Sequence, residues 1–580
     1  MKTLLSLMKK SWGYYVVAFA VMIASIVLDM FNPRMIQRLI DEVIIGQNRG
    51  AFRGILIMLV AITVGRAIFG YTKEMMFDLS SSKIIIQLRQ KLFNHIQKLS
   101  FSFFDKNNTG ELMSRVKDDA ENVMNAICFG FMLFAEQAIY FIIASVILFT
   151  INWKLAVMSL CVLPIIAFVA MRLEKRVGKT FEEISDQRAL MNTTAQENLA
   201  GVRLVKAFGR ERHEIEKFLS QNRENYRLNV NQAKIWARYQ PRIEFLSNLI
   251  VVLVTSVGGW LVIGGEPDFT IGTLVAYTNY IYMLIWPMRM LGWLINVLAQ
   301  CLASIKKIDV LFAEQPEIQE PAVPQEPVAR RGHVVFDHVS LEANGMKILE
   351  DICLDAKPGS TVAIMGATGS GKTSLVNLIG RYYDPTAGKV IVDGTDVREQ
   401  ALEPLRKSVS VVMQEVFLFS DTIEENIRFG SDDLPVEALV QASKDAHVHE
   451  FVMKLQDGYK TLVGERGIGL SGGQKQRISM ARALARNSAV LVFDDATSAL
   501  DMETEHQIQQ ALQARTEETK FIIAHRVSAV KNADEILFLE GGRIVERGTH
   551  QELLDLGGRY WDTYNLQFQG LIDMHEEEAG

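Results

Sequence analysis

The sequence has little cysteine, no excess of positive charge and no recognisable cleavage signal. Its four cysteines (Cys128, Cys161, Cys301 and Cys353) are widely spaced, so they match no zinc or dithiol pattern and are expected to be free thiols. The net charge of −6 gives no indication of nucleic-acid binding. The first long apolar stretch lacks a small-residue cleavage site, which predicts that it is retained as a membrane span.

Long apolar stretches, in contrast, are abundant. Hydrophobic residues make up 49% of the 580 residues and the mean hydropathy is +0.12, which is high for a wholly soluble protein. A chain of this length is also expected to form two or more domains. Six stretches approach the ~20 residues that cross a bilayer as a helix. These predicted spans are Tyr14–Phe31, Ile55–Phe77, Ala126–Phe149, Leu155–Val169, Phe245–Ile263 and Leu274–Leu302.

The segments between the spans predict the topology. The first, third and fifth connections are short, whereas the second and fourth are long and hold most of the Lys and Arg, within Lys73–Lys117 and Arg172–Arg242. The positive-inside rule places both long segments and both termini in the cytoplasm. Their Glu-, Lys-, Arg- and Leu-rich composition indicates spans that continue as helices into the cytosol. The sequence therefore predicts a multi-pass protein of the cytoplasmic membrane.

Some polar and adaptable residues within the spans are candidates for substrate contact. Asp29, Arg66 and Glu136 are charged, and charge inside a membrane usually faces a bundle interior or a cavity. Pairing between helices, or a solvated position, is the alternative for each. Flexible or flat apolar side chains in the sixth span suit an adaptable pocket, although core packing is the alternative. They are Met283, Trp286, Met288, Met290 and Trp293.

The composition changes after the sixth span. We predict an all-α membrane domain over residues 1–313 and an exposed linker over 314–331, which is rich in Pro and Glu. Residues 332–567 alternate strand-like and helix-like patterns, which predicts an α/β domain. Residues 568–580 form an acidic tail that we expect to be disordered.

A phosphate-binding loop is predicted early in the second domain. It follows the strand-like run Thr361–Met365 and precedes the helix-like run Ser374–Tyr382, which is the context this motif requires. Its backbone N–H groups would cradle the phosphates of ATP, Lys372 would reach the β- and γ-phosphates, and the Thr373 hydroxyl would bind Mg²⁺. The nucleotide-binding residues are Gly366, Ala367, Thr368, Gly369, Ser370, Gly371, Lys372, Thr373 and Ser374.

Further candidates follow other strand-like runs. A buried-type run ends in Asp494 and Asp495, and the carboxyl ends of such strands are where α/β sheets bind ligands. Asp494 is a candidate Mg²⁺ ligand through water, and Gln414 could bind the same ion and orient water. His525 could bond a γ-phosphate and detect its presence, with a purely structural role as the alternative.

A second glycine-containing loop opens the predicted helix Lys475–Arg486. Glycines beside a helix start let backbone N–H groups approach an anion, which the helix dipole also favours. The residues of this loop are Ser471, Gly472, Gly473 and Gln474.

With these motifs the chain resembles an exporter-type half-transporter of the ATP-binding cassette (ABC) superfamily, with a membrane domain fused ahead of a nucleotide-binding domain. GATGSGKT resembles Walker A, VVMQE the Q-loop, LSGGQ the signature, VLVFD Walker B, SALD the D-loop and IIAHR the H-loop. GERG at Gly464–Gly467 resembles the X-loop. Ser102–Arg115 resembles a coupling-helix segment, and Gln196–Glu211 the second intracellular-loop pattern.

The resemblance implies a dimer with shared nucleotide sites. Two chains would pair head to tail, with each ATP held between Walker A of one chain and LSGGQ of the other. By this implication Ser471, Gly472, Gly473 and Gln474 serve the nucleotide held by the partner. ATP and Mg²⁺ are the implied cofactors.

The chain departs from the family pattern at two positions. Asp495 occupies the place of the catalytic glutamate, and its side chain is one methylene shorter, a shift on the order of 1 Å that can cost about 10²-fold in rate. Ala343 occupies the place of an aromatic residue that stacks on adenine. The chain thus resembles the degenerate subunit of heterodimeric bacterial multidrug exporters. Asp495 would be an impaired general base, and the partner would carry a catalytic Glu.

Other functions remain open at this stage. The first is a homodimeric exporter with two slow sites, acting on a lipid or a peptide. The second is an ATP-gated channel or a regulatory membrane protein, and the third is a soluble-type ATPase, against which the six spans argue. The Met- and aromatic-rich later spans favour an amphipathic, drug-like substrate.

Overall fold

The structure, a computed structural model, describes residues 12–266, 269–325, 329–343, 345–431, 433–464, 467 and 469–567. The predicted acidic tail and the middle of the GERG motif lie outside the described residues. The chain forms two compact units, one of Met1–Lys98 with Asn107–Gln315 and one of Leu99–Lys106 with Pro316–Gly580. Leu99–Lys106, inside the predicted membrane domain, belongs to the second unit.

The first unit is entirely helical in its described part. Six helical stretches are long and apolar enough to cross a membrane, which confirms the six predicted spans. The elements are α2 (Trp12–Arg38), η1 (Leu39–Ile45), α3 (Arg49–Ile96), α5 (Thr109–Ser114), η2 (Arg115–Asp119), α6 (Ala120–Asn125), η3 (Ala126–Gly130), α7 (Phe131–Ile151), α8 (Trp153–Ala200), α9 (Val202–Ala207), α10 (Glu211–Ile263) and α11 (Ile271–Ala313).

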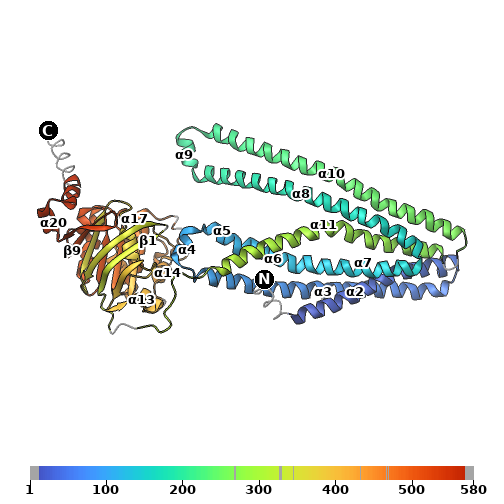
Figure 1. Cartoon of the computed structure of the whole chain (residues 1–580), viewed down its shortest axis with the longest axis horizontal. Helices are drawn as coiled ribbons and strands as arrows, with labels where there is room; N and C mark the ends of the chain where they lie inside the picture. Colours follow the sequence, from blue (N-terminus) through green and yellow to red (C-terminus); the bar gives the residue numbers. More distant parts are fainter. Residues whose placement is uncertain are drawn as a thin grey trace. The chain divides into compact units, whose positions relative to one another are not determined.

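These helices extend well beyond their apolar stretches. Helices α3 and α8 have 48 residues each, and a helix of that length measures about 72 Å at 1.5 Å per residue. The apolar core of a bilayer is only about 30 Å thick. Helices α8 and α10 run side by side and are joined through the short helix α9 (Figure 1). The long basic segments are therefore continuations of the spans, as the composition predicts.

Polar caps fix the sharp reversals between spans. The Asn48 side chain accepts hydrogen bonds from the N–H groups of Gly50 and Ala51 at the start of α3. Asn152 caps α8 in the same way, through the N–H groups of Lys154 and Leu155. Such caps satisfy the first backbone donors of a helix, so a new helix can start after a very short connection.

The second unit contains two sheets in its described part. One has four antiparallel strands in the order β2-β1-β4-β5, and the other has six strands in the order β10-β9-β3-β8-β7-β6. The strands are β1 (Val334–Ala343), β2 (Met346–Ala356), β3 (Thr361–Gly366), β4 (Ala387–Val392), β5 (Thr395–Asp396), β6 (Val409–Val412), β7 (Val490–Asp494), β8 (Thr519–Ile523), β9 (Glu535–Glu540) and β10 (Arg543–Gly548).

The second unit also contains helical segments. They are α4 (Phe101–Lys106), α12 (Lys372–Asn377), α13 (Leu402–Ser408), α14 (Ile423–Arg428), α15 (Val436–Asp445), α16 (His449–Val452), η4 (Gly458–Lys460), α17 (Gly472–Ala485), α18 (Met502–Ala514), α19 (Val527–Val530) and α20 (His550–Leu556). Strands β3, β6, β7, β8 and β9 are parallel, and all five residues of β7 are buried. A parallel sheet needs both faces covered, which is why its strands read as continuous apolar runs.

Two helices have bounds that differ from the sequence prediction. Helix α12 starts at Lys372 because Gly371, at φ 100°, caps it in a left-handed conformation, and it ends at Asn377 rather than Tyr382. Helix α17 starts at Gly472 rather than Lys475, since Ser471 and Gln474 form a capping box.

Candidate active site

Four parallel strands carry the predicted nucleotide residues to one edge of the sheet. Gly366 ends β3 and Asp494 ends β7, while His525 and Gln414 each lie two residues beyond the ends of β8 and β6. The strands are in register, with Ile364 opposite Ile523 and Ile523 opposite Asp494. Their carboxyl ends therefore coincide, and this is the edge where such sheets bind ligands.

Glycine is required at two positions of the phosphate loop. Gly366 has φ 139° and Gly371 has φ 100°, a backbone region that side chains disfavour. A Cβ on Gly366 would lie 2.1 Å from the Leu539 carbonyl oxygen, and one on Gly371 would lie 2.8 Å from the Ile348 carbonyl oxygen. Within the described residues the Ser370 hydroxyl is buried without a hydrogen-bond partner. A buried, unsatisfied hydroxyl in this loop suits a bound phosphate oxygen.

Lys372 folds back over the same loop. Its Nζ donates to the carbonyl oxygens of Gly366 at 2.8 Å and Ala367 at 2.7 Å. Burial lowers the pKa of Lys372, and the nearby carboxylates of Asp494 and Asp495 oppose that shift. The ammonium group thus lies among the phosphate loop and the two strand-end carboxylates.

Thr373 and Asp494 are neighbours at this edge. Burial raises the pKa of the Asp494 carboxyl, and the nearby Thr373 hydroxyl opposes the rise. A hydroxyl, a carboxylate and an amide oxygen are hard ligands of the kind Mg²⁺ prefers. The set Thr373, Asp494 and Gln414 fits Mg²⁺, although Gln414 is exposed and only its position at the same edge supports its inclusion.

Asp495 is held by its backbone. It has φ 46°, which is uncommon for a non-glycine residue. Its N–H donates to the Ile523 carbonyl oxygen at 3.0 Å, and its own carbonyl oxygen accepts from the Ser498 hydroxyl at 3.0 Å. The sheet and the following turn therefore fix where the short Asp495 side chain begins.

The signature residues use their side chains to start α17. Ser471 Oγ accepts from the Gln474 N–H, and Gln474 Oε1 accepts from the Ser471 N–H at 2.9 Å. One turn later the buried Gln476 donates to Ser498 Oγ at 3.2 Å and accepts from the Ala499 N–H at 3.1 Å. Gln476, which the sequence did not single out, thus ties the signature helix to the turn after Asp495.

The position of the missing aromatic residue is exposed. Ala343 ends β1 and lies opposite Met346 in the antiparallel pair. Directly opposed residues point to the same face of a sheet. Met346 is 68% exposed, so an apolar thioether lies on the face where Ala343 offers only a methyl group.

The charged residues of the membrane helices form pairs. Arg66 contacts Asp29 at 2.7 Å, and the Tyr140 hydroxyl donates to Asp29 at 2.9 Å. Glu136 accepts from Lys73 at 2.9 Å. Pairing between helices, the alternative to substrate contact, is therefore what the structure shows for Asp29, Arg66 and Glu136. Lys73 was missed in the sequence because it lies at the polar end of its apolar stretch.

Some methionines and tryptophans of the sixth span pack in the helical core, and others lie on the surface. Met283 and Met288 pack partly against the helical core, whereas Trp286 is 52% exposed. Trp293 is also exposed. These positions leave apolar side chains on the surface of α11.

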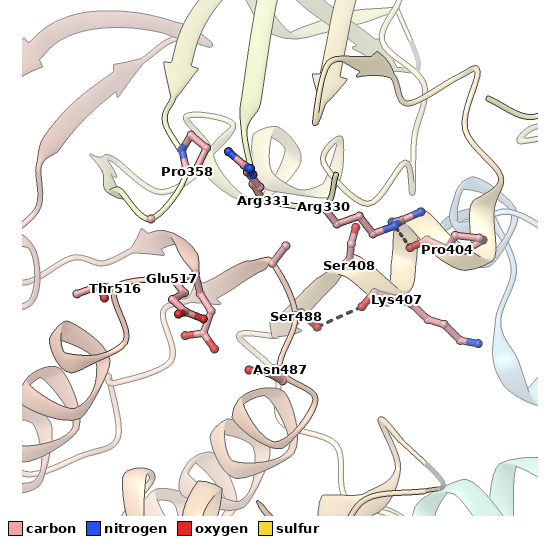
Figure 2. Close-up of a pocket in the computed structure, with 13 residues that line it drawn as sticks. Arg330, Arg331, Pro358, Pro404, Lys407, Ser408, Asn487, Ser488, Thr516 and Glu517 are labelled. Carbon is pink, nitrogen blue, oxygen red and sulfur yellow. Dashed lines mark hydrogen bonds between the residues drawn. The ribbon is translucent and has the colours of Figure 1, made fainter. Parts of the chain in front are cut away.

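A cavity of about 710 Å³ lies at the opposite edge of the sheet. It is bounded by residues that precede the starts of β3, β6, β7 and β8, together with Arg330 and Arg331 (Figure 2). Since parallel sheets bind ligands at their carboxyl ends, we do not assign the nucleotide to it. A smaller cavity of about 350 Å³ is lined by Gly366, Ala367 and His525 on the nucleotide side.

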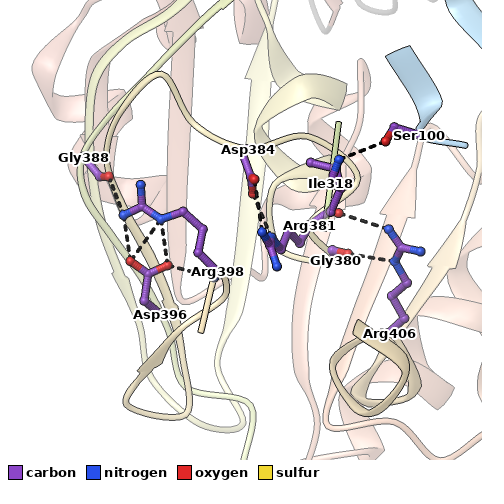
Figure 3. Close-up of polar contacts among 9 residues, drawn as sticks. All are labelled: Ser100, Ile318, Gly380, Arg381, Asp384, Gly388, Asp396, Arg398 and Arg406. Atoms are coloured by element: carbon purple, nitrogen blue, oxygen red, sulfur yellow. Dashed lines mark hydrogen bonds and ion pairs between the residues drawn. The ribbon is translucent and has the colours of Figure 1, made fainter. Parts of the chain in front are cut away.

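The predicted coupling segment begins on the second unit. The Phe101 ring of α4 lies 4.7 Å from the Tyr382 ring, and the Tyr383 hydroxyl donates to Asp105 at 2.7 Å. Arg406 donates to the carbonyl oxygens of Gly380 and Arg381 and so braces the turn that presents both tyrosines (Figure 3). Ser100 also accepts from the Ile318 N–H at 3.0 Å (Figure 3).

Comparison with known proteins agrees with this geometry. The family "ABC transporter transmembrane region" matches residues 15–288, and "ABC transporter" matches residues 349–498. The chain is 36% identical to the "Uncharacterized ABC transporter ATP-binding protein YknU" of Bacillus subtilis (strain 168), over 99% of each chain. It is 34% identical to the "Putative multidrug export ATP-binding/permease protein YgaD" of the same organism, over 92% of this chain and 93% of that protein.

A lipid A-core flippase and a solved exporter structure are also similar to this chain. The "ATP-dependent lipid A-core flippase" of Syntrophus aciditrophicus (strain SB) is 31% identical, over 100% of this chain and 96% of that protein. The structure of a bacterial Atm1-family ABC exporter with ATP bound superposes with a TM-score of 0.81 at 27% identity, covering 96% of this chain and 99% of that one. The protein is therefore a multi-pass membrane half-transporter of the ABC transporter family, which binds and hydrolyses ATP to drive export.

Proposed function

We propose that this chain exports amphipathic, drug-like compounds as one half of a heterodimer in which its own Walker site is slow. The observation that carries the proposal is Asp495, the carboxylate that follows the Asp494 strand end. Half-transporters of this family act as dimers. A slow site on this chain therefore calls for a partner that carries a glutamate at the matching position.

The fixed backbone of Asp495 supports a slow site. Because its N–H is bonded to Ile523 and its carbonyl oxygen to Ser498, the main chain cannot advance to compensate for the missing methylene. The carboxylate would stop about 1 Å short of the attacking water, and a misplacement of that size can cost about 10²-fold in rate.

The other candidate residues at the carboxyl edge of the parallel sheet would bind the nucleotide normally. Lys372 would leave the loop carbonyls for the β- and γ-phosphates. Thr373, Asp494 and Gln414 would hold Mg²⁺ at the carboxyl edge of the sheet. Mg²⁺, when bound, neutralises charge on the phosphates. His525 would bond the γ-phosphate, so that ATP stays bound while hydrolysis is slow.

The signature loop would complete the site of the partner. Ser471 and Gln474 form the capping box at the start of α17 and are exposed or half-buried, and the N–H groups of Gly472 and Gly473 have no partner within the helix. Such donors suit the phosphate oxygens of a nucleotide held by another chain. With Gly472 and Gly473 intact, that second site would be fully active if the partner supplies glutamate.

The substrate proposal rests on the membrane helices and the relatives. Exposed apolar side chains such as Trp286 on α11 suit amphipathic compounds, and one relative is named for multidrug export. A homodimeric lipid exporter is the second candidate, because another relative of similar identity is a lipid A-core flippase.

The first test is the ATPase activity of the purified chain alone, compared with Asp495→Glu. The proposal expects a nearly inactive wild type and a rise of about tenfold or more in the variant. Asp555→Glu, which makes the same chemical change on the exposed surface of α20, should change nothing. A wild type that turns over several times per second, unchanged in Asp495→Glu, would show that Asp495 suffices and favour a homodimer.

The second test addresses the transported compound. Inside-out vesicles containing the chain with its partner should accumulate a fluorescent cationic amphiphile when ATP is supplied, and vanadate should stop the accumulation. Movement of a labelled phospholipid without dye accumulation would favour the lipid exporter. Flux that runs only down a gradient would indicate an ATP-gated channel instead.

A further inference from the structure

Gln567 binds the main chain on both sides of Arg526, the residue that directly follows His525. The Gln567 Nε2 donates to the His525 carbonyl oxygen at 2.7 Å, and its Oε1 accepts from the Val527 N–H at 2.9 Å. We propose that Gln567 is a positioning residue that aims the His525 imidazole at the γ-phosphate. The proposal rests on the role of His525 proposed above, and nothing in the sequence motifs points to Gln567.

Apart from the ion pair of Arg526 with Glu505, few hydrogen bonds hold the main chain of the segment that Gln567 binds. His525 lies beyond the last residue of β8, and the preceding Ala524 N–H reaches the Ile364 carbonyl oxygen only at 3.4 Å. Helix α19 starts at Val527, and its N-cap Arg526 supplies no side-chain cap. The first N–H groups of a helix need an acceptor, and Gln567 provides one from a distant part of the chain.

The helical stretch that carries Gln567 is anchored at Tyr560. Gln567 ends the described part of this stretch, residues 559–567, which follows α20. Tyr560 in that stretch is fully buried, its hydroxyl lies 2.7 Å from His550 Nδ1, and its N–H donates to Glu546 at 3.0 Å. Tyr560 also belongs to the same apolar cluster as Val527. The stretch therefore presents Gln567 from a fixed position.

The helical stretch and the phosphate loop border the same space. The cavity of about 350 Å³ is lined by Gly366, Ala367 and His525 on one side and by Asp562, Thr563 and Leu566 on the other. Gln567 follows Leu566 directly and contacts the main chain of His525 rather than its ring. It would consequently act on the nucleotide through His525 and not by touching the phosphates.

The two contacts require an amide. A glutamine side chain offers a donor and an acceptor together, whereas a glutamate offers acceptors only. Gln567→Glu would keep an acceptor for the Val527 N–H. It would lose the donor to His525 and place a negative charge beside that carbonyl oxygen. This variant separates the support of α19 from the placement of His525.

The experiment measures the binding of ATP and of ADP to the full-length chain by competition with a fluorescent nucleotide. His525→Ala should lower the affinity for ATP about tenfold, which is the contribution of one hydrogen bond to a charged group. The affinity for ADP should not change. Gln567→Ala and Gln567→Glu should reproduce that loss of ATP preference. The variant Gln551→Ala serves as a control, since Gln551 is exposed and bonds only to Asp555 within α20.

The outcomes distinguish this proposal from the one on which it rests. If His525→Ala leaves the ATP preference intact, the proposed role of His525 is wrong. If His525→Ala removes the preference and both Gln567 variants keep it, the positioning role of Gln567 is wrong. The combined variant His525→Ala/Gln567→Ala should bind ATP with the same affinity as His525→Ala alone. If the losses of ATP affinity in the two single variants add up in the combined variant, Gln567 does not act through His525. Gln567→Glu should melt at a higher temperature than Gln567→Ala, since it keeps the cap on the Val527 N–H.

Discussion

Glu505 and Arg526 form an ion pair at 3.4 Å, although the Glu505 side chain is only 4% exposed. The other carboxylate oxygen of Glu505 accepts a hydrogen bond from the Thr497 hydroxyl at 2.9 Å. Thr497 lies two residues after Asp495, and Arg526 directly follows His525. One buried carboxylate on α18 therefore connects the turns that carry two of the proposed catalytic residues.

Replacing Glu505 is expected to loosen both turns. Glu505→Ala should lower stability by about 2 kcal/mol, because the half-buried Thr497 hydroxyl loses its acceptor and Arg526 loses its partner. Glu505→Gln should keep the bond from Thr497 and cost less. Thermal unfolding of the full chain measures both. The matched control is Glu403→Ala, which breaks an exposed pair with Lys407 and should change stability little. An equal loss in both alanine variants would contradict a special role for Glu505.

The contact between Phe101 and Tyr382 is expected to matter for transport more than for ATP binding. Helix α4 lies in the chain between two membrane helices, yet it packs on the nucleotide-binding unit. Phe101→Ala should lose an aromatic pair worth about 0.5–1.5 kcal/mol and lower the amount of substrate transported per ATP hydrolysed, with ATP affinity unchanged. Parallel transport and ATPase measurements on vesicles would show this.

Phe104 provides the control for that prediction. It lies on the same helix, is 41% exposed and contacts the neighbouring Phe103 ring at 5.6 Å. Phe104→Ala should therefore leave the transport ratio near the wild-type value. If both variants equally lower the amount of substrate transported per ATP, the effect comes from α4 as a whole and not from the contact between Phe101 and Tyr382.

The pair formed by Lys73 and Glu136 is expected to behave as a unit. Their side chains are 8% and 16% exposed on two different membrane helices. Glu136→Leu should destabilise the membrane domain by about 3 kcal/mol, because it leaves a buried ammonium without a partner. The double change Lys73→Met/Glu136→Leu should recover most of that loss, since no buried charge remains. Thermal stability in detergent for the two single variants and the double variant checks this, and additive losses would show that the two groups do not interact.

The exposed ion pair Arg212–Glu216 is the matched comparison for the buried pair. Its side chains are 94% and 68% exposed, so Glu216→Leu should have little effect on stability. The contrast between the two pairs measures how much the apolar surroundings contribute.

The sequence alone determined the elements that depend on local pattern. Apolar runs of bilayer length predicted the six spans, because the cost of placing charge in a membrane is set residue by residue. Strand, glycine loop and helix followed one another around Gly366–Thr373, so the phosphate loop was predicted from its immediate neighbours. The strand ends at Asp494 and His525 were predicted in the same way. The absence of a glutamate at position 495 could be read directly.

Only the tertiary structure decided which distant residues meet. Gln567 and His525 are 42 positions apart, and Lys73 and Glu136 are 63 apart. No local pattern marks such partners, because their contact depends on how the elements between them pack. The same reason explains α4, whose sequence says that it is helical but not which unit it joins. Its place follows from the Tyr382 and Tyr383 side chains, which Arg406 and the turn after α12 hold on the surface of the second unit.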